Sequence, residues 1–302
     1  TFTVSFTLGD VKKNITTDTD TDTDTTLKPS KQEIIKKALK FHSQGNIQEA
    51  AKYYQHFINQ GFKDHRVFSN YGNILRDFGK LKEAELYIRK AILIKSNYAN
   101  AHLNLGNILR DLGKLEEAEL STREAIALKP DFSIAYLNLG KILKDLGKLN
   151  DAELSTRKAI KLNPNSSEVY DNLGSILKDL GKLKDAELFH RKAIQLDPNF
   201  AQAHYNLGIT LKDLGNLVEA EYLIRKAIEL DSELTEAYFS LSTLVTSANN
   251  NGWHKKLFSE KILENKSSKD KVNLFFARAN VLHKKKKYND SSYYLNQANK
   301  IK

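Results

Sequence analysis

The chain has 302 residues with no cysteine and no methionine, 40% hydrophobic and 28% charged residues, and a formal charge of +10. The lack of cysteine excludes disulfide scaffolds, thiolate metal sites and cysteine nucleophiles. No apolar run approaches the ~18 residues that span a bilayer, and the N-terminus lacks the features of a signal peptide, so we expect a cytoplasmic protein.

Residues 1–30 form the first predicted segment, an N-terminal tail. Thr and Asp alternate from Thr17 to Thr26 with nothing to bury, which predicts disorder. Hydrophobic and polar residues alternate in 2–8 as in a strand that could add to a sheet edge, although a frayed tail is favoured because a lone strand has no partner. The chain has no Met and begins with the small residue Thr1, so we expect Thr1 to be the natural N-terminus after removal of the initiator methionine.

Charge is distributed unevenly along the chain. Residues 1–30 carry a net −2 and residues 252–302 a net +9, which leaves +3 for residues 31–251. We therefore expect no long polyanion-binding surface, and any electrostatic role belongs to the C-terminal segment.

Glycine and proline recur with a period of 34 residues through the middle of the chain. Two glycine series and one proline series follow this period: Gly72, Gly106, Gly140, Gly174 and Gly208; Gly79, Gly113, Gly147, Gly181 and Gly215; Pro130, Pro164 and Pro198. Such a period indicates a repeat architecture.

Each unit predicts a helical hairpin, as residues 99–132 illustrate. Apolar residues recur at helical spacing in 101–112 and in 116–128. Gly113 ends the first helix at positive φ, and Pro130 stops the second. Small residues are expected where the two helices cross, and larger ones fill the contacts around the crossing: Gly106 and Ala118, then Leu105, Leu109, Ala125 and Leu128.

These units resemble the tetratricopeptide repeat family. In residues 133–166 the matching positions are Tyr136, Leu139, Gly140, Leu143, Gly147, Ala152, Ala159 and Pro164. Two positions depart, since Leu143 replaces a tyrosine and Thr156 an aromatic residue. The resemblance implies an all-α fold, a right-handed superhelical solenoid of stacked helix-turn-helix hairpins with first helices on its concave side.

The pattern divides the chain into three parts. The tail 1–30 precedes six regular repeats in 31–234. Residues 235–302 hold a degenerate repeat, with Ser242 in place of glycine and extra residues at Asn249, Asn250 and Asn251, and then a truncated repeat from Val272. This last part carries the basic excess.

The sequence has no catalytic signature, so we predict a protein that is not an enzyme, with no cofactor and no metal. The stretch from Gly72 to Lys80 superficially resembles a phosphate loop, but six residues separate its glycines and Leu81 replaces the required Ser or Thr. The histidines form no ligand pair, and His102 and His204 take aromatic packing positions.

An asparagine recurs at one place on the first helix of five consecutive units: Asn70, Asn104, Asn138, Asn172 and Asn206. Helical spacing directs this ladder to the concave face, where carboxamides could bind the main chain of an extended peptide. The ladder is similar to that in the superhelix of O-linked N-acetylglucosamine transferases, which implies peptide binding. The alternative is that repeat duplication copied an asparagine that merely tolerates a wet groove, and both interpretations stay open.

Charged residues also recur. A basic residue followed by Asp ends each first helix, from Arg76-Asp77 to Lys212-Asp213, and is expected to pair with Asp of a neighbouring repeat. Second helices carry i,i+4 pairs at Glu85/Arg89, Glu119/Arg123, Glu153/Arg157, Glu187/Arg191 and Glu221/Arg225. We interpret both series as solvated, stabilising faces.

Two functions follow. The first is an interaction scaffold whose concave groove binds an extended polypeptide segment. The alternative is the substrate-recognition part of a larger transferase whose catalytic domain lies beyond Lys302, as in bacterial fusions of such repeats to sulfotransferase or glycosyltransferase domains. The open end of the last repeat predicts docking of a downstream domain or a second copy. Nucleic-acid binding is not expected, because aromatic interleaving and an Arg-rich groove are missing.

Overall fold

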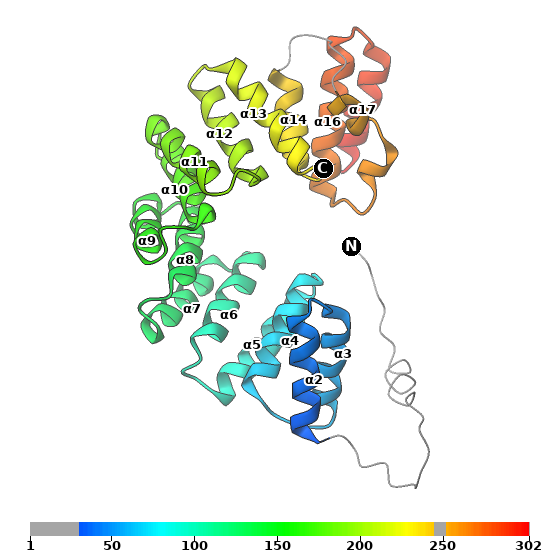
Figure 1. The fold of residues 1–302 in the computed structure, drawn as a ribbon. Coiled ribbons are helices and arrows are strands. Elements are labelled where there is room, and N and C mark those ends of the chain that lie inside the picture. The colour runs from blue at the N-terminus through cyan, green and yellow to red at the C-terminus, as the bar shows by residue number, and fades with distance from the viewer. Residues whose placement is uncertain (1–29, 245–251, 302) are drawn as a thin grey trace. The chain divides into compact units, whose positions relative to one another are not determined.

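The computed structural model describes residues 30–244 and 252–301 (Figure 1). Residues 1–29 of the tail, which we expect to be disordered, and the extra residues at 249–251 lie outside the described residues. The described chain consists of helices and connecting turns, with no strand in these ranges. The predicted all-α helical repeat is confirmed.

The chain divides into two compact units, and the first ends at Leu146. Its described helices are α2 (Lys31–Ser43), α3 (Ile47–Asn59), α4 (His65–Asp77), α5 (Leu81–Ile94), α6 (Ala99–Asp111), α7 (Leu115–Leu128) and α8 (Ser133–Asp145). Helices α2 and α3, α4 and α5, and α6 and α7 pack as hairpins, and each hairpin packs against the next helix along the chain.

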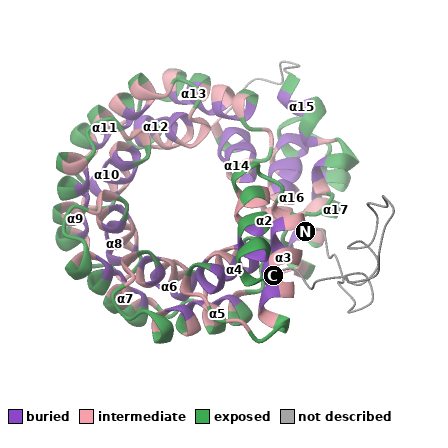
Figure 2. Cartoon of the chain, turned by 60° about the horizontal axis from the view of Figure 1, so that its bottom comes forward, coloured by how far each residue is buried: buried purple, intermediate pink, exposed green. Residues whose placement is uncertain are grey.

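The second unit begins at Gly147. Its described elements are α9 (Leu149–Leu162), α10 (Ser167–Asp179), α11 (Leu183–Leu196), α12 (Ala201–Asp213), α13 (Leu217–Leu230), α14 (Thr235–Leu244), α15 (Gly252–Leu257), the 3₁₀ helix η1 (Glu260–Leu263), α16 (Ser268–Lys284) and α17 (Tyr288–Ile301). Hairpins form between α10 and α11, α12 and α13, and α16 and α17, while α14 packs on α16. In each unit, buried residues gather where neighbouring helices meet (Figure 2).

The turn inside each hairpin has the predicted glycine geometry. Gly113 has φ +74°, a left-handed conformation that other residues adopt only with strain. The amide of Lys114 then donates to the carbonyl of Leu109 at 2.8 Å, which closes the end of α6. The predicted helix stop is confirmed.

The crossing of α6 and α7 depends on Gly106. A Cβ built there would lie 2.2 Å from Thr122 Oγ1, so only glycine fits. The predicted core residues Leu105, Leu109, Ala118 and Ala125 are buried. The prediction for Leu128 is wrong, because this side chain is 36% exposed at the last residue of α7.

The C-terminal part departs from the predicted repeat register. The last hairpin begins at Ser268 rather than Val272, because the side chain of Ser267 caps α16 by accepting from the amide of Asp270 at 3.1 Å. After α14, the short elements α15 and η1 stand where a second helix would lie. Their side chains Leu257 and Ile262 join the buried cluster of α14 and α16.

Ion pairs connect the helices as the charge pattern predicts. All five i,i+4 pairs form on the second helices, at 2.5–2.9 Å. Between repeats of the first unit, Arg76 donates to Asp111 at 2.5 Å and Arg110 to Asp145 at 2.6 Å. The expected pairing across repeats is therefore confirmed for these two arginines.

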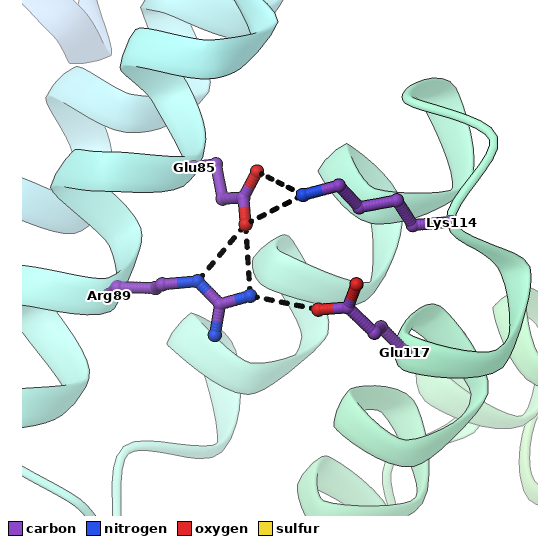
Figure 3. Close-up of polar contacts among 4 residues, drawn as sticks. All are labelled: Glu85, Arg89, Lys114 and Glu117. Carbon is purple, nitrogen blue, oxygen red and sulfur yellow. Dashed lines mark hydrogen bonds and ion pairs between the residues drawn. The ribbon is translucent and has the colours of Figure 1, made fainter.

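One ion-pair cluster links α5 to the following hairpin (Figure 3). Glu85 accepts from Arg89 at 2.9 Å and from Lys114 at 3.0 Å, and Arg89 also donates to Glu117 at 3.1 Å. Partial burial raises the pKa of Glu85, but the hydrogen bonds from Lys114 and Arg89 outweigh it and hold the pKa below the ordinary 4.5.

Acid should therefore weaken this link. A carboxylate whose pKa is lower in the folded state contributes stability that is complete above the unfolded pKa and is lost as pH falls through the folded pKa. We expect Glu85→Gln to lower Tm at neutral pH and to flatten the fall of Tm below pH 4.5, measured by circular dichroism. The exposed Glu124→Gln is the matched control; equal pH slopes for Glu85→Gln and the unsubstituted protein would contradict this prediction.

Candidate functional site

In the first unit, the ladder asparagines are hydrogen-bonded to the preceding repeat. All three donate through Nδ2, which fixes the plane of each carboxamide. The acceptors are the Tyr54 hydroxyl for Asn70 at 3.1 Å, Ser69 Oγ for Asn104 at 3.2 Å and Asn107 Oδ1 for Asn138 at 2.7 Å. These side chains are half-buried.

The second unit holds the other two members of the ladder. Asn172 Nδ2 donates to Thr156 Oγ1 at 3.0 Å, and Asn206 Nδ2 donates to the carboxylate of Asp171 at 2.9 Å. Gln202 donates to Asn206 Oδ1 at 3.1 Å. Asn172 is 8% exposed, which makes it the most enclosed of the five.

The ladder therefore has a structural role that the sequence interpretation missed. At four of the five, all except Asn206, one amide hydrogen makes a contact between repeats and the second has no partner among the described residues. Asn206 Nδ2 donates to Ser175 Oγ at 3.5 Å as well as to Asp171. Within the described residues, the Oδ1 atoms of Asn70, Asn104, Asn138 and Asn172 have no hydrogen-bond partner. These groups are fixed in position and keep both hydrogen-bonding functions.

A buried Asp–His pair supports Asn206. Asp171 is 7% exposed and His190 is fully buried, and His190 Nδ1 lies 2.9 Å from Asp171 Oδ1. The ring of His190 fills the space beside Gly174, where a Cβ would come within 2.7 Å of it. The signal in the sequence was the appearance of Asp171 and His190 in one unit, 19 residues apart, where the two preceding units have Leu and Thr.

Second helices carry a repeated exposed hydrophobic residue that the sequence interpretation also missed. In the first unit Leu86 is 51% and Leu120 69% exposed. In the second unit Leu154, Leu188 and Tyr222 are 63–68% exposed. These positions follow the glutamates of the i,i+4 pairs, so the interpretation of this face as purely charged and solvated is incomplete.

The structure also bears on metal sites and on membrane spans. In residues 30–244 and 252–301, no three His, Asp or Glu side chains come together as metal ligands would. Every helix in these ranges is too short or too polar to cross a bilayer.

Family models agree with the repeat pattern. Models described as "TPR repeat" or "Tetratricopeptide repeat" match residues 65–98, 106–147, 134–166, 156–187, 174–215 and 201–234. Together these matches span 65–98 and 106–234, more than half of the chain. A search of curated proteins found no match.

Solved structures share the fold. The chain is similar to Cut9 or Hcn1 in the crystal structure of the APC/C hetero-tetramer Cut9-Hcn1, with 15% identity, a TM-score of 0.63, and coverage of 86% of this chain and 48% of that one. A thermophilic TPR protein of Thermus thermophilus is 17% identical with a TM-score of 0.52, covering 60% of this chain and 99% of its own. YrrB, described as a TPR protein with an unusual peptide-binding site, is 25% identical with a TM-score of 0.47, covering 63% of this chain and 98% of its own.

Proposed function

This chain belongs to the tetratricopeptide repeat family, and from that premise we propose that it is a protein-interaction scaffold whose asparagine ladder binds the main chain of an extended polypeptide. The ladder is the set Asn70, Asn104, Asn138, Asn172 and Asn206. Three members belong to the first unit and two to the second, and each unit is considered by itself.

One observation carries the proposal. The ladder carboxamides are anchored through Nδ2, while at four of the five, all except Asn206, an amide hydrogen and the Oδ1 atom have no partner among the described residues. A fixed carboxamide loses little side-chain entropy when a ligand arrives. It can donate to a peptide carbonyl and accept from a peptide amide, which every polypeptide offers.

The expected partner is therefore selected more by its extended shape than by its side chains. Affinity should be modest, because each exposed hydrogen bond contributes only about 1 kcal/mol. No observation in the described ranges favours the alternative of a fused transferase, which stays a prediction of the sequence.

Replacement of Asn104 and Asn138 by Ala should weaken the binding of labelled extended peptides of unrelated sequences by about tenfold or more, because about 1 kcal/mol is lost for each hydrogen bond. Fluorescence anisotropy measures the affinity, and circular dichroism shows that the helices remain. The matched control is Ser69→Ala, which removes the acceptor of Asn104 and keeps the carboxamide.

The control separates binding from folding. Ser69→Ala should lower Tm slightly and weaken binding less than the double variant does, since Asn104 loses its anchor but keeps its hydrogen-bonding atoms. Equal losses of affinity in Ser69→Ala and in the double variant would mean that the ladder only joins repeats, and the proposal would fail.

A further inference from the structure

A cavity of about 830 Å³ opens in the second unit where the repeat pattern fails. It is lined by residues 232–233 before α14, by Tyr238 of α14, and by residues between 255 and 266, from α15 through η1 to the loop before α16. The lining residues that matter below are Lys255, Lys256, Lys261, Lys266, Ser259 and Tyr238.

Arg278 fixes the position of the segment Leu257 to Ser259, which forms one side of this cavity. Arg278 is 1% exposed and donates through Nε to the carbonyl of Leu257 at 2.9 Å and through Nη2 to that of Ser259 at 3.0 Å. Its guanidinium also lies 5.7 Å from the ring centre of Phe258 and 5.3 Å from that of Tyr294. The turn that carries Ser259 is therefore built into the core and does not depend on a ligand for its position.

The lining is rich in positive charge. Four lysines face two glutamates, Glu233 and Glu264, and Lys266 is already paired with Glu233. Lys255, Lys256 and Lys261 are exposed, and within the described residues none of them has an ion-pair partner. Glu264 is the carboxylate that remains beside these three ammonium groups, so the lining keeps a net positive charge, which favours an anion with more than one charge.

The floor of the cavity holds a hydroxyl that lacks a partner. Tyr238 is fully buried, and among the described residues its hydroxyl makes no hydrogen bond. Burial, and then the nearby carboxylates of Glu233 and Asp231, raise the pKa of Tyr238 to about 12, so it keeps its proton. Because no part of Tyr238 is exposed, a ligand in the cavity would contact the surrounding lining and not this hydroxyl.

We propose that this cavity binds a phosphate-bearing ligand of diphosphate size, with Lys255, Lys256 and Lys261 as the charge-neutralising groups and Ser259 as a hydroxyl donor. The proposal is independent of the asparagine ladder. A planar carboxylate is best matched by the fork of Arg, and among the described residues no Arg lines the cavity. Ammonium and hydroxyl groups suit the several oxygens of phosphates. The described lining has no exposed aromatic ring on which a base could stack, so recognition is assigned to the phosphates themselves.

The test is isothermal titration of the full chain with inorganic pyrophosphate, with acetate as the monovalent carboxylate comparison. Pyrophosphate should bind and acetate should not. Combined replacement of Lys255, Lys256 and Lys261 by Ala should lower the affinity for pyrophosphate at least tenfold. The matched control removes the same charge from exposed lysines of the same unit outside the cavity, Lys161, Lys184 and Lys300.

Each outcome decides the proposal. Equal weakening in the two triple variants would show a diffuse charge effect and overturn it, as would equal affinity for acetate and pyrophosphate. Titration with adenosine triphosphate and with a phosphoserine peptide then distinguishes a free phosphate compound from a phosphorylated protein segment, and failure of pyrophosphate, the nucleotide and the peptide alike would overturn the assignment.

Discussion

Gly106→Val should disrupt the α6–α7 hairpin while helices far along the chain keep their protection from hydrogen exchange. A Cβ at this position would lie 2.2 Å from Thr122 Oγ1 and 3.2 Å from the carbonyl oxygen of Ala118. Thr122 cannot turn away freely, because its hydroxyl donates to that same carbonyl at 2.8 Å. Overpacking of this kind costs about 1–3 kcal/mol, and the rigid backbone oxygen places the expected loss at the upper end.

The spread of the damage tests the repeat architecture. In a solenoid, stability is approximately a sum of terms within repeats and between nearest neighbours. Hydrogen exchange should therefore accelerate in α6 and α7, less in α4 and α8, and hardly in α16 and α17. Gly252→Ala is the control, because no atom of the described residues lies within 4 Å of a Cβ built there. Uniform loss of protection from α2 to α17 would count against a local, repeat-by-repeat stability.

The features that could be predicted from the sequence depend on local spacing. The 34-residue period, the turn at Gly113 and the i,i+4 pairs each follow from residues close together in the chain. The position of the ladder asparagines was predictable for the same reason. Their hydrogen-bond partners were not, because Ser69, Asn107, Thr156 and Asp171 belong to other helices and share no residue type.

The proposed phosphate cavity illustrates a feature that could not be predicted from the sequence. It forms where α15 and η1 replace a regular second helix, so no repeated pattern marks it. The basic excess of residues 252–302 was visible in the sequence, but a sum of charges does not say which lysines lie around one cavity. That depends on the segment 255–261, which Arg278 holds through the carbonyls of Leu257 and Ser259.

Arg278→Met should have the largest effect on the C-terminal part of the second unit. Methionine fills much of the volume and contacts Phe258 and Tyr294, but it leaves the carbonyls of Leu257 and Ser259 without the donors they have now. The nearest carboxylate, Glu260, is 86% exposed and 3.9 Å away, so the carbonyls and rings are the principal partners of this buried cation. Two hydrogen bonds from a charged group, at about 1.5–3 kcal/mol each, set the expected loss at roughly 3 kcal/mol or more.

Two measurements check this together. Hydrogen exchange should accelerate in α15, η1 and α16, and pyrophosphate should bind more weakly because the wall at Ser259 is no longer held. Arg278→Lys, which keeps the charge but cannot reach both carbonyls in the same geometry, should fall between Met and the unsubstituted protein in both measurements. If Arg278→Met is as stable as the unsubstituted chain, the guanidinium does not hold this segment. If only its stability falls while pyrophosphate affinity is unchanged, the wall at Ser259 does not contribute to the anion site.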